Sequence, residues 1–502
     1  MNRFAYIFVA VLTLCGQIGL YAQTYEQAVR RNFWNESQNV AGIRQDSLSR
    51  SYAELSGGYE AGGFKQSWQA DQTWHAGART ASIRHLERIS FKGAFSFEQK
   101  EGYGMCGSMF TDPGYYPIDV LEFTPGRKTL QTYALDGGLS YDLNQNWRLG
   151  AMADFASANM AKRKDLRHTN WKLDFSVAPA FMYQKGDLAA GISYIYRKTG
   201  ETVNAEQVGT AESSYYAFFD KGLMYGVYQV WTGSGVHLDE AGVNRLPVKE
   251  YSNGLAVQMQ YKGFFAEAEY ARTRGSVGEK EYIWFRFPGN MAAAHAGYKA
   301  GRSGSEHYAR LDFEWKSQAL HESVLEKITE NGVTIVTDHG SNLVQRRDVF
   351  EFCPSYEYVS SMWEVSAGAD FVWKNGITSQ IYPYIYTQSL STVAVRVGGL
   401  ARFGGFELSA QALYGCGAVR EDQRAADTSA EALVTPFRLQ EWYELQKEYD
   451  TAAKAGLDMV LRYNFNNGLY IKAAGGWLHG FDMKYISGAD RCSATLGLGY
   501  EF

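Results

Sequence analysis

The last twelve residues, Arg491-Cys-Ser-Ala-Thr-Leu-Gly-Leu-Gly-Tyr-Glu-Phe502, decide the fold class. Every second residue from Cys492 to Phe502 is apolar or aromatic, whereas the residues between them are hydroxylated, charged or glycine. This period of two predicts a strand with one apolar face. The strand ends on an aromatic side chain, which fits a barrel strand that reaches the aromatic girdle at a membrane interface. We therefore predict an all-β fold, a transmembrane antiparallel β-barrel.

The same alternation recurs along the chain from residue 50 onward. In the row from Trp147 to Phe155, the odd-numbered residues are apolar or aromatic, and Arg148 and Asp154 stand on the other face. Further apolar rows of this kind occupy residues 133–143, 171–183, 188–196, 255–261, 311–315, 352–358, 363–373, 393–403, 406–414, 457–465 and 469–477. Each row predicts a strand with one face for lipid and one for the lumen.

The connections between the rows alternate in length. Tight turns near residues 145, 186, 262, 404 and 467 are separated by long segments at 99–128, 198–251, 274–290, 317–345, 415–450 and 479–490. Short periplasmic turns and long extracellular loops are the outer-membrane arrangement, with both termini in the periplasm, and the rows add up to about 18 strands within a range of 16 to 20. Residues 376–402 read either as one long strand or as two short ones.

A large soluble sandwich is the alternative to a barrel. It would also show alternation, with its charges on the exposed face and its apolar rows buried. The long rows that end in Trp and Tyr, the even strand number and the secretory signal would then be coincidences, so we favour the transmembrane barrel.

The N-terminus predicts export. Arg3 precedes an apolar run from Phe4 to Leu20, and Ala22 precedes the return of polarity, so residues 1–22 are predicted to be a signal peptide. Residues 23–49 have no period of two and are predicted to be a periplasmic leader or a plug. Residues 50–502 form the predicted barrel, and the predicted location is the cell outer membrane.

Composition and charge exclude two other classes. No segment after the signal contains about 18 uninterrupted apolar residues, which excludes a helical membrane protein. The 35 Tyr, 28 Phe and 12 Trp residues stand beside a mean hydropathy of −0.33, as expected of a barrel, in which only alternate positions need to be apolar. A net charge of −5 with both signs interspersed lacks the basic footprint of nucleic-acid binding.

If the apolar rows face lipid, the charged positions between them line the lumen. The lumen-lining candidates are Lys172, Asp174, Arg310, Asp312, Glu314, Asp370, Arg396, Asp458 and Arg462. Because both signs are mixed, we expect cross-strand ion pairs that hold the wall in register. A selectivity filter made of charged rings is the alternative role.

No catalytic, metal or cofactor site is predicted. The chain has no Gly-x-Ser-x-Gly motif, and His321-Glu322 lacks the second histidine of a zinc helix. Four cysteines follow the signal, namely Cys106, Cys353, Cys416 and Cys492, and their spacing fits no metal motif. A disulfide between Cys106 and Cys416, which are placed in predicted loops, is neither supported nor excluded by the sequence.

Three loops carry candidate contacts. Thr435-Pro436 predicts a helix start, after which Trp442 and Tyr449 lie on one side of a helix that either constricts the mouth, contacts a partner or packs on its own rim. Glu330-Asn331-Gly332 predicts a hairpin that projects above the membrane. The segment 198–251 is rich in aromatic residues suited to sugar, peptide or protein contacts, or to an inward plug. Its candidate residues are Tyr215, Tyr216 and Trp231.

The signal, the aromatic-rich strands and the terminal Gly497-Leu498-Gly499-Tyr500-Glu501-Phe502 resemble outer-membrane barrels of the Bacteroidota type, in a family of unknown function. The resemblance implies that Phe502 is the signal read by the assembly machinery, and it supplies no catalytic residues.

Three functions follow as hypotheses. The first is a porin-like channel or uptake component for a small solute, since about 18 strands leave room for a channel. The second is a structural or binding barrel whose protein partner is a surface lipoprotein or a TonB-dependent transporter. In either case the barrel also contacts outer-membrane lipid and lipopolysaccharide. The third is an outer-membrane hydrolase or acyltransferase.

Overall fold

The computed structural model describes residues 24–47, 49–206, 216–225, 228–230, 246–279, 282–302, 304–379, 385–424 and 439–502. The predicted signal peptide and the candidates Tyr215 and Trp231 lie outside these residues. The strands in chain order are β1 (Arg50–Gly62), β2 (Gln72–His85), β3 (Ile89–Ser108), β4 (Asp119–Asp142), β5 (Trp147–Lys162), β6 (Arg167–Lys185), β7 (Leu188–Glu206), β8 (Tyr216–Asp220), β9 (Tyr228–Val230), β10 (Leu246–Tyr261), β11 (Phe264–Glu279), β12 (Tyr282–Arg302), β13 (Ser305–Glu330), β14 (Val333–Ser360), β15 (Trp363–Ser379), β16 (Ile385–Phe403), β17 (Phe406–Gln423), β18 (Lys454–Asn464), β19 (Leu469–Gly480) and β20 (Asp490–Glu501).

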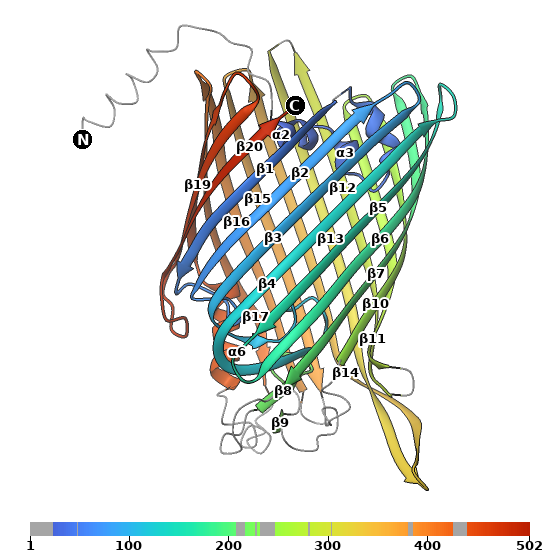
Figure 1. Ribbon diagram of the computed structural model, residues 1–502, viewed down its shortest axis with the longest axis vertical. Helices are drawn as coiled ribbons and strands as arrows, with labels where there is room; N and C mark the ends of the chain where they lie inside the picture. Colours follow the sequence, from blue (N-terminus) through green and yellow to red (C-terminus); the bar gives the residue numbers. More distant parts are fainter. Residues whose placement is uncertain are drawn as a thin grey trace, which may run out of the picture.

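The strands close into one barrel (Figure 1). Eighteen of the twenty described strands pair with their neighbours antiparallel, and β1 joins β2 on one side and β20 on the other, with Leu55 opposite Leu498. The short strands β8 and β9 do not belong to the wall, because β8 pairs with the outer end of β4 from within. The predicted antiparallel barrel of about 18 strands is therefore confirmed.

The last residue of the chain completes the seam between β1 and β20. The Ser51 amide donates to the Phe502 carbonyl at 2.9 Å, and the Phe502 amide donates to the Ser51 carbonyl at 2.9 Å. Its ring stacks on Tyr500 with 5.8 Å between the ring centroids. The aromatic end of the chain thus belongs to the wall itself.

The outer surface of the barrel is apolar. Leu135, Leu255 and Leu496 are 51%, 55% and 68% exposed, far more than core residues of a soluble domain. Aromatic pairs stand near both rims, such as Tyr59 with Trp74 and Trp147 with Tyr183, each with ring centroids 4.5 Å apart. An apolar belt between two aromatic girdles is the surface of an outer-membrane barrel, and that is where this protein resides.

The two rims differ. The short turns and both ends of the barrel chain lie at one rim, at the top of Figure 1, which is the periplasmic rim by the usual arrangement. At the opposite, outer rim, several predicted loops are strand instead. Residues 274–279 belong to β11 and 282–290 to β12, and residues 317–330 belong to β13 and 333–345 to β14, because the hairpin ladders continue beyond the belt. The predicted turn at Glu330-Asn331-Gly332 is confirmed at the tip of a hairpin that projects past the rim.

Two further sequence expectations are corrected or resolved. Cys106 lies in β3 and Cys416 in β17 rather than in loops, and the four described cysteines are all free. The ladder simply extends farther than the belt, so positions outside the apolar rows are still strand. The ambiguous stretch 376–402 divides between β15, which ends at Ser379, and β16, which begins at Ile385.

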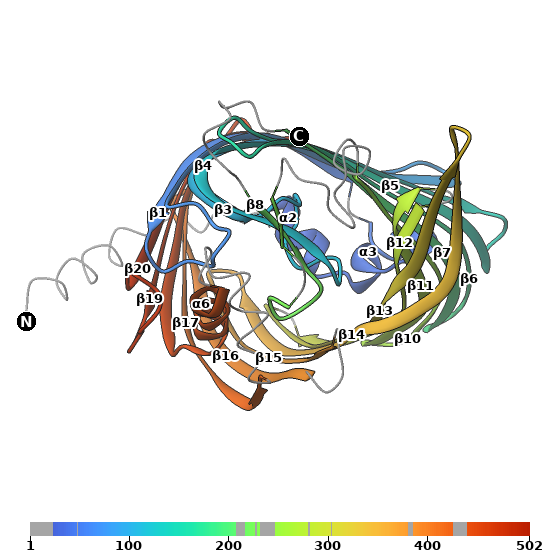
Figure 2. The same ribbon diagram turned by 90° about the horizontal axis from the view of Figure 1, so that it is seen from below.

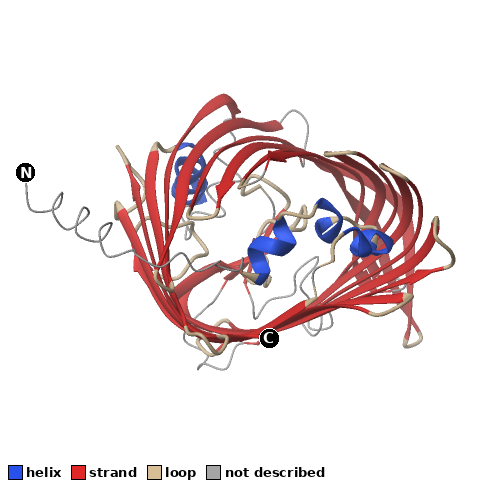
Figure 3. Ribbon diagram, turned by 90° about the horizontal axis from the view of Figure 1, so that it is seen from above, coloured by secondary structure: helices blue, strands red, loops and turns tan. Residues whose placement is uncertain are grey.

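Residues 24–47, called the inner segment below, lie inside the barrel at the periplasmic rim (Figure 3). They form α2 (Tyr25–Arg30), α3 (Phe33–Glu36) and the 3-10 helix η1 (Val40–Gln45). Thr24 begins α2 with a capping box to Gln27, and the side chains of Asn32 and Asn39 cap the next two helices. The Arg44 guanidinium donates to the Leu86 carbonyl of a short turn at 2.8 Å, which fixes the segment at that rim.

A second set of elements fills the outer half of the lumen (Figure 2). Residues 109–118, called the inward loop below, pack with β8 against the inner face of the wall, while α6 (Leu439–Thr451) lies beside β16 and β17. Phe285 and Phe287 of β12 are fully buried and face inward in the same cluster as Phe110 and Tyr116 of the loop. The outer half is thus largely filled by an apolar core. None of the described helices is long and apolar enough to cross a membrane.

The assignment of faces can be tested on β6. Leu173 faces outward and is 39% exposed, whereas the Ser176 hydroxyl donates to the Asp154 carboxylate at 2.6 Å in the lumen. Leu173→Arg is expected to cost about 2 to 4 kcal/mol at a lipid-facing position, while Ser176→Arg gains a carboxylate neighbour. The amount of heat-modifiable barrel in outer-membrane fractions should fall sharply only for Leu173→Arg. Equal losses would reverse the assignment.

Candidate functional site

The inward loop is held by one arginine of the wall. The Arg347 guanidinium on β14 donates to the carbonyls of Gly114 at 2.8 Å and Tyr116 at 2.9 Å, and also to the carbonyl of Tyr115. Its Nε donates to Gln318 Oε1 on β13 at 2.8 Å. A planar guanidinium can hold several carbonyl oxygens at once, so the loop is fixed to the β13–β14 wall.

The tip of the loop reaches separate parts of the wall. Lys316 on β13 and Lys172 on β6 place their ammonium groups 4.3 Å and 4.7 Å from the centroid of the Tyr115 ring. The Tyr115 hydroxyl lies 3.3 Å from the Thr199 hydroxyl and donates to Glu250 Oε1 at 3.4 Å. Burial raises the pKa of Tyr115 well above its usual value, so this hydroxyl stays protonated. Tyr115 is therefore fixed in the lumen by contacts with β6, β7, β10 and β13.

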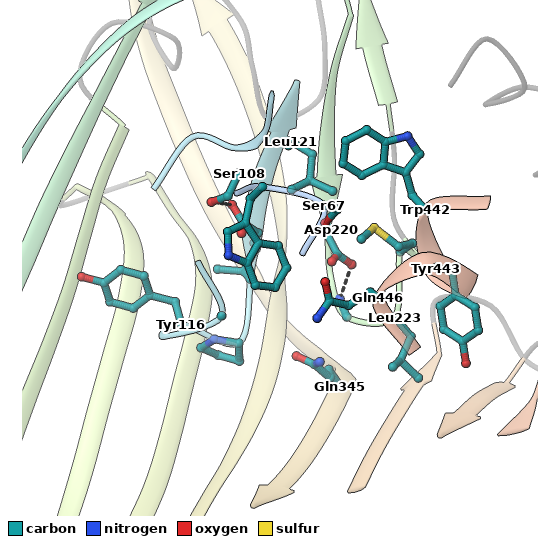
Figure 4. A pocket seen from close by; sticks show the side chains of 18 of the residues that line it. Ser67, Ser108, Tyr116, Leu121, Asp220, Leu223, Gln345, Trp442, Tyr443 and Gln446 are labelled. Atoms are coloured by element: carbon teal, nitrogen blue, oxygen red, sulfur yellow. Dashed lines mark hydrogen bonds between the residues drawn. The ribbon is translucent and has the colours of Figure 1, made fainter. Parts of the chain in front are cut away.

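An outer cavity of about 210 Å³ lies between the inward loop, β8 and α6 (Figure 4). Trp68, Trp442 and Tyr443 supply aromatic surface to its lining. Asp119 and Asp220 supply two carboxylates. A largely apolar cavity with a few convergent polar groups is the usual form of a small-molecule site.

The two carboxylates are direct neighbours in the pairing of β4 with β8, where Asp119 stands opposite Asp220. Ser108 donates its hydroxyl to Asp119 Oδ1 at 2.8 Å, and the Gly222 amide donates to Asp220 Oδ1 at 2.8 Å. Burial raises the pKa of Asp220 to about 6, even though backbone amides favour its charged form. Within the described part of the chain, neither carboxylate forms an ion pair.

At the other end of the lumen, polar contacts join the inner segment to the wall. Arg31 pairs with Glu364 of β15 at 2.6 Å and with Glu357 of β14 at 3.3 Å. On the other side of the segment, Asn39 Nδ2 donates to the Phe181 carbonyl of β6 at 3.1 Å and to Gln258 Oε1 of β10 at 2.9 Å. These contacts reach several strands, so the segment spans the lumen.

Apolar contacts seat the same segment. Trp34, Val40 and Ile43 are each at most 2% exposed and pack against inward-facing wall residues such as Phe265, Met152 and Ile195. The wall is recessed by glycine where the segment docks. A Cβ added at Gly297 of β12 would lie 2.5 Å from the Phe33 ring, and one added at Gly150 of β5 would lie 2.7 Å from the Ala41 amide. The wall is thus shaped to receive the segment.

Two further spaces lie along β13 and β14. One of about 160 Å³ is lined by Glu314, Lys316 and Glu351, and it shares Gly114 and Arg347 with the outer cavity. The other, of about 410 Å³, is lined by Arg310 and Asp312 and reaches the inner segment at Phe33 and Glu36. The cavities therefore follow one side of the lumen from the outer mouth to the inner segment.

The predicted lumen residues fall into separate groups. Lys172 pairs with Asp174 at 3.4 Å near Tyr115, and Arg396 pairs with Asp370. On β13, Arg310 pairs with Glu36 of the inner segment at 2.6 Å, Asp312 contacts His295 at 2.8 Å, and Glu314 lines the middle space. On β18, Arg462 pairs with Glu501 at 2.6 Å, and Asp458 lies against Gly476. Of the predicted lumen residues, Arg310, Asp312 and Glu314 are the ones that line the row of cavities.

The predicted loop contacts turn toward the barrel itself. The Trp442 ring meets the Phe123 ring edge-on at 5.0 Å, and Tyr449 stacks on Phe64 at 5.1 Å. The predicted helix is present as α6, and its expected start at residues 435–436 lies outside the described residues. Tyr216 begins the inner strand β8. The helix thus closes part of the mouth.

Sequence reasoning missed Arg347, Tyr115, Asp119 and Asp220, all of which lie inside the outer half. One signal was available in the run Tyr282-Ile-Trp-Phe-Arg-Phe287, where apolar residues occupy both faces of a strand. A lumen-facing row that becomes apolar near the outer rim indicates a covering element inside. No group of three or more His, Cys, Asp or Glu side chains within the described ranges is placed to hold a metal ion.

Comparisons with known proteins bear on family and fold. The model of a family of unknown function, DUF6850, matches residues 40–502. A search of curated proteins finds no match. Among solved structures, the siderophore receptor PiuA from Acinetobacter baumannii is 9% identical, with 90% of this chain and 82% of that chain covered and a TM-score of 0.42. The ferripyoverdine receptor of the outer membrane of Pseudomonas aeruginosa is 8% identical, with 91% and 72% covered and a TM-score of 0.42. The receptor function of those proteins is not transferred to this chain.

The role of Arg347 can be tested against its neighbour on the opposite face of β14. Arg347→Met removes charged hydrogen bonds to the loop carbonyls, each of which contributes about 1.5 to 3 kcal/mol. Arg346 is exposed outside the cavity, so Arg346→Met is the matched control. Hydrogen exchange measured by mass spectrometry should become faster in residues 109–118 for Arg347→Met only. Unchanged exchange would mean that the apolar core holds the loop without the arginine.

Proposed function

Since the chain belongs to DUF6850, a family of unknown function, its role is argued from its own geometry, and we propose a gated uptake barrel for a small polar solute. The solute binds in the outer cavity and passes along the inner face of β13 and β14. It leaves toward the periplasm when the inner segment moves. The sequence suggested a channel for a small solute, and the proposal adds that the inner segment, residues 24–47, closes this channel at rest.

The observation that carries this proposal is the row of three spaces between the two closures. The outer cavity and the middle space share Arg347 in their linings. The middle space is lined by Lys316 and Glu314 of β13, and the inner space by the next inward-facing residues of that strand, Asp312 and Arg310. Charges of both signs along one strand can replace the hydration of a polar solute step by step. A wall that served stability alone would not need hollow space beside its charges.

The inner segment is suited to act as a gate that is closed at rest. Burial of Trp34, Val40 and Ile43 contributes about 1.5 to 3 kcal/mol each, so the segment leaves the lumen only with an input of free energy. Its ion pairs, such as Arg31 with Glu364, can be exchanged for water once the segment moves. A passive open pore would have neither feature.

A second candidate function rests on the projecting hairpin. Beyond the rim, Val324, Ile328 and Ile335 are 45%, 42% and 54% exposed on its two strands. Exposed apolar side chains on a strand pair fit a protein partner at the cell surface, such as a lipoprotein or a transporter barrel. This role is compatible with uptake, because the hairpin lies outside the row of cavities.

Planar-bilayer conductance tests the gate. The refolded chain without residues 1–22 should conduct little, and a variant that also lacks residues 24–47 should conduct steadily, because the periplasmic end is then open. Gly297→Leu should raise conductance as well, since the new side chain takes the place of the Phe33 ring. Gly137→Leu is the matched control, because no atom lies within 4 Å of a Cβ added there.

The opposite result is equally informative. If the deletion variant folds, as judged by heat modifiability, and still does not conduct, the outer half alone blocks the lumen. Uptake through the barrel would then be refuted, and capture of a surface partner by the hairpin would become the leading function.

A further inference from the structure

The outer cavity contains two neighbouring carboxyl groups that form no ion pair with the described residues. Asp119 and Asp220 face each other across neighbouring strands, an arrangement that is destabilising for like charges unless something compensates it. The cations at the cavity margin are already engaged. Lys447 pairs with Asp422 of β17 and with Glu444, the latter at 2.7 Å, and Arg347 holds the inward loop.

Arg424, another cation near Asp220, also contacts other groups. Its guanidinium lies 4.6 Å from the Tyr386 ring centroid and 4.4 Å from the Tyr443 ring centroid. It donates to Gln440 Oε1 at 2.6 Å. Its charge favours the ionised form of Asp220, but among the described residues no cation forms an ion pair with Asp119 or Asp220, so a cationic group from outside the chain can pair with them.

A buried amide adds independent evidence for a ligand. Gln345 lines the cavity and is 7% exposed, and its Oε1 has no hydrogen-bond partner among the described residues. Its amide lies against Gly222, where a Cβ would collide with it. Gln446 of α6 lines the same cavity and likewise has a buried Oε1 without a partner there. An unsatisfied buried acceptor is costly, so a bound donor would relieve it.

Four of the polar groups that line the cavity offer acceptor oxygens to a ligand. Two carboxylates and two amide oxygens can receive hydrogen bonds, as Figure 4 shows for Asp220, Gln345 and Gln446 around the same space. A ligand that matches them must donate hydrogen bonds, and a positive charge would balance the carboxylates. An anionic ligand would meet repulsion from both.

The remaining lining suits an apolar or aromatic body. Trp68 and Trp442 flank Gly107, since a Cβ added at that glycine would lie 3.5 Å from Trp68 Cβ and 3.4 Å from Trp442 Cζ3. Tryptophan faces attract organic cations and cover apolar groups. Glycine at this position leaves the aromatic surface accessible from the cavity.

We propose that the outer cavity binds a small organic cation, whose ammonium group lies between Asp119 and Asp220 and whose apolar part lies against Trp68 and Trp442. Gln345 and Gln446 offer acceptor oxygens for the third ammonium hydrogen. This assignment rests on the proposed uptake function and names the class of solute that enters. A volume of about 210 Å³ restricts the ligand to a small molecule.

Isothermal titration of the refolded full barrel at neutral pH tests this assignment. The probes are phenethylamine, which is an ammonium ion at this pH, its neutral analogue 2-phenylethanol, the anion 3-phenylpropionate, and calcium chloride. Phenethylamine should bind at least about tenfold more tightly than the neutral analogue, and the anion should not bind. Asp220→Asn and Asp119→Asn should each weaken phenethylamine binding at least about tenfold. Asp112→Asn is the control, because Asp112 lies in the inward loop but outside the cavity lining.

Several results would overturn the assignment. Equal binding of the neutral analogue, or unchanged binding in both aspartate variants, would mean that charge does not select the ligand. Tighter binding of calcium than of phenethylamine would make the cavity a metal site instead. Conductance separates this failure from that of the proposed function. A conducting deletion variant with no ammonium binding would refute only the solute class, whereas ammonium binding with a non-conducting deletion variant would refute uptake.

Discussion

The structure depends on one constraint, namely that no backbone amide or carbonyl can face lipid without a hydrogen bond. A closed ladder is the solution for strands, and here the closure is made by β1 and β20, down to the paired backbones of Ser51 and Phe502. Eighteen strands enclose a lumen too wide for wall side chains alone to fill. The chain therefore has to supply further elements, and it does so from both ends of the barrel.

The two closures differ in their physics. The outer one is an apolar core in which the inward loop packs against Phe285 and Phe287 and is clamped by Arg347, so it has the character of permanent structure. The inner one combines a few buried side chains with ion pairs and amide contacts to many strands. Hollow space lies along β13 and β14 and in the outer cavity, and this asymmetry is the basis for a gate at the periplasmic side.

The sequence predicts the wall well and its contents poorly. Successive side chains of a strand point to opposite faces, so the period of two in the sequence is enough to place Leu135 and Asp136 on different faces of the wall. This pattern depends only on neighbouring residues of the chain. The contents depend on long-range contacts. Asp119 and Asp220 meet only because β8 folds back onto β4. Arg347 and Arg346 are neighbours of the same type, and the structure shows that Arg347 faces the lumen while Arg346 is exposed on the other face of β14. The same period of two also hides the change from a polar to an apolar inner row, since Phe285 and His295 share one face of β12.

The most direct test of a lumen that the inner segment closes at rest uses a native thiol. Cys353 on β14 stands opposite Asp312, between the outer closure and the inner segment. With Cys416 and Cys492 replaced by serine, its modification by a small charged methanethiosulfonate reagent can be followed in the refolded barrel, with Cys353→Ser as the blank. We predict slow modification in the intact chain and fast modification once residues 24–47 are deleted. Equally fast modification in both would contradict the account, because the lumen would then be open at rest.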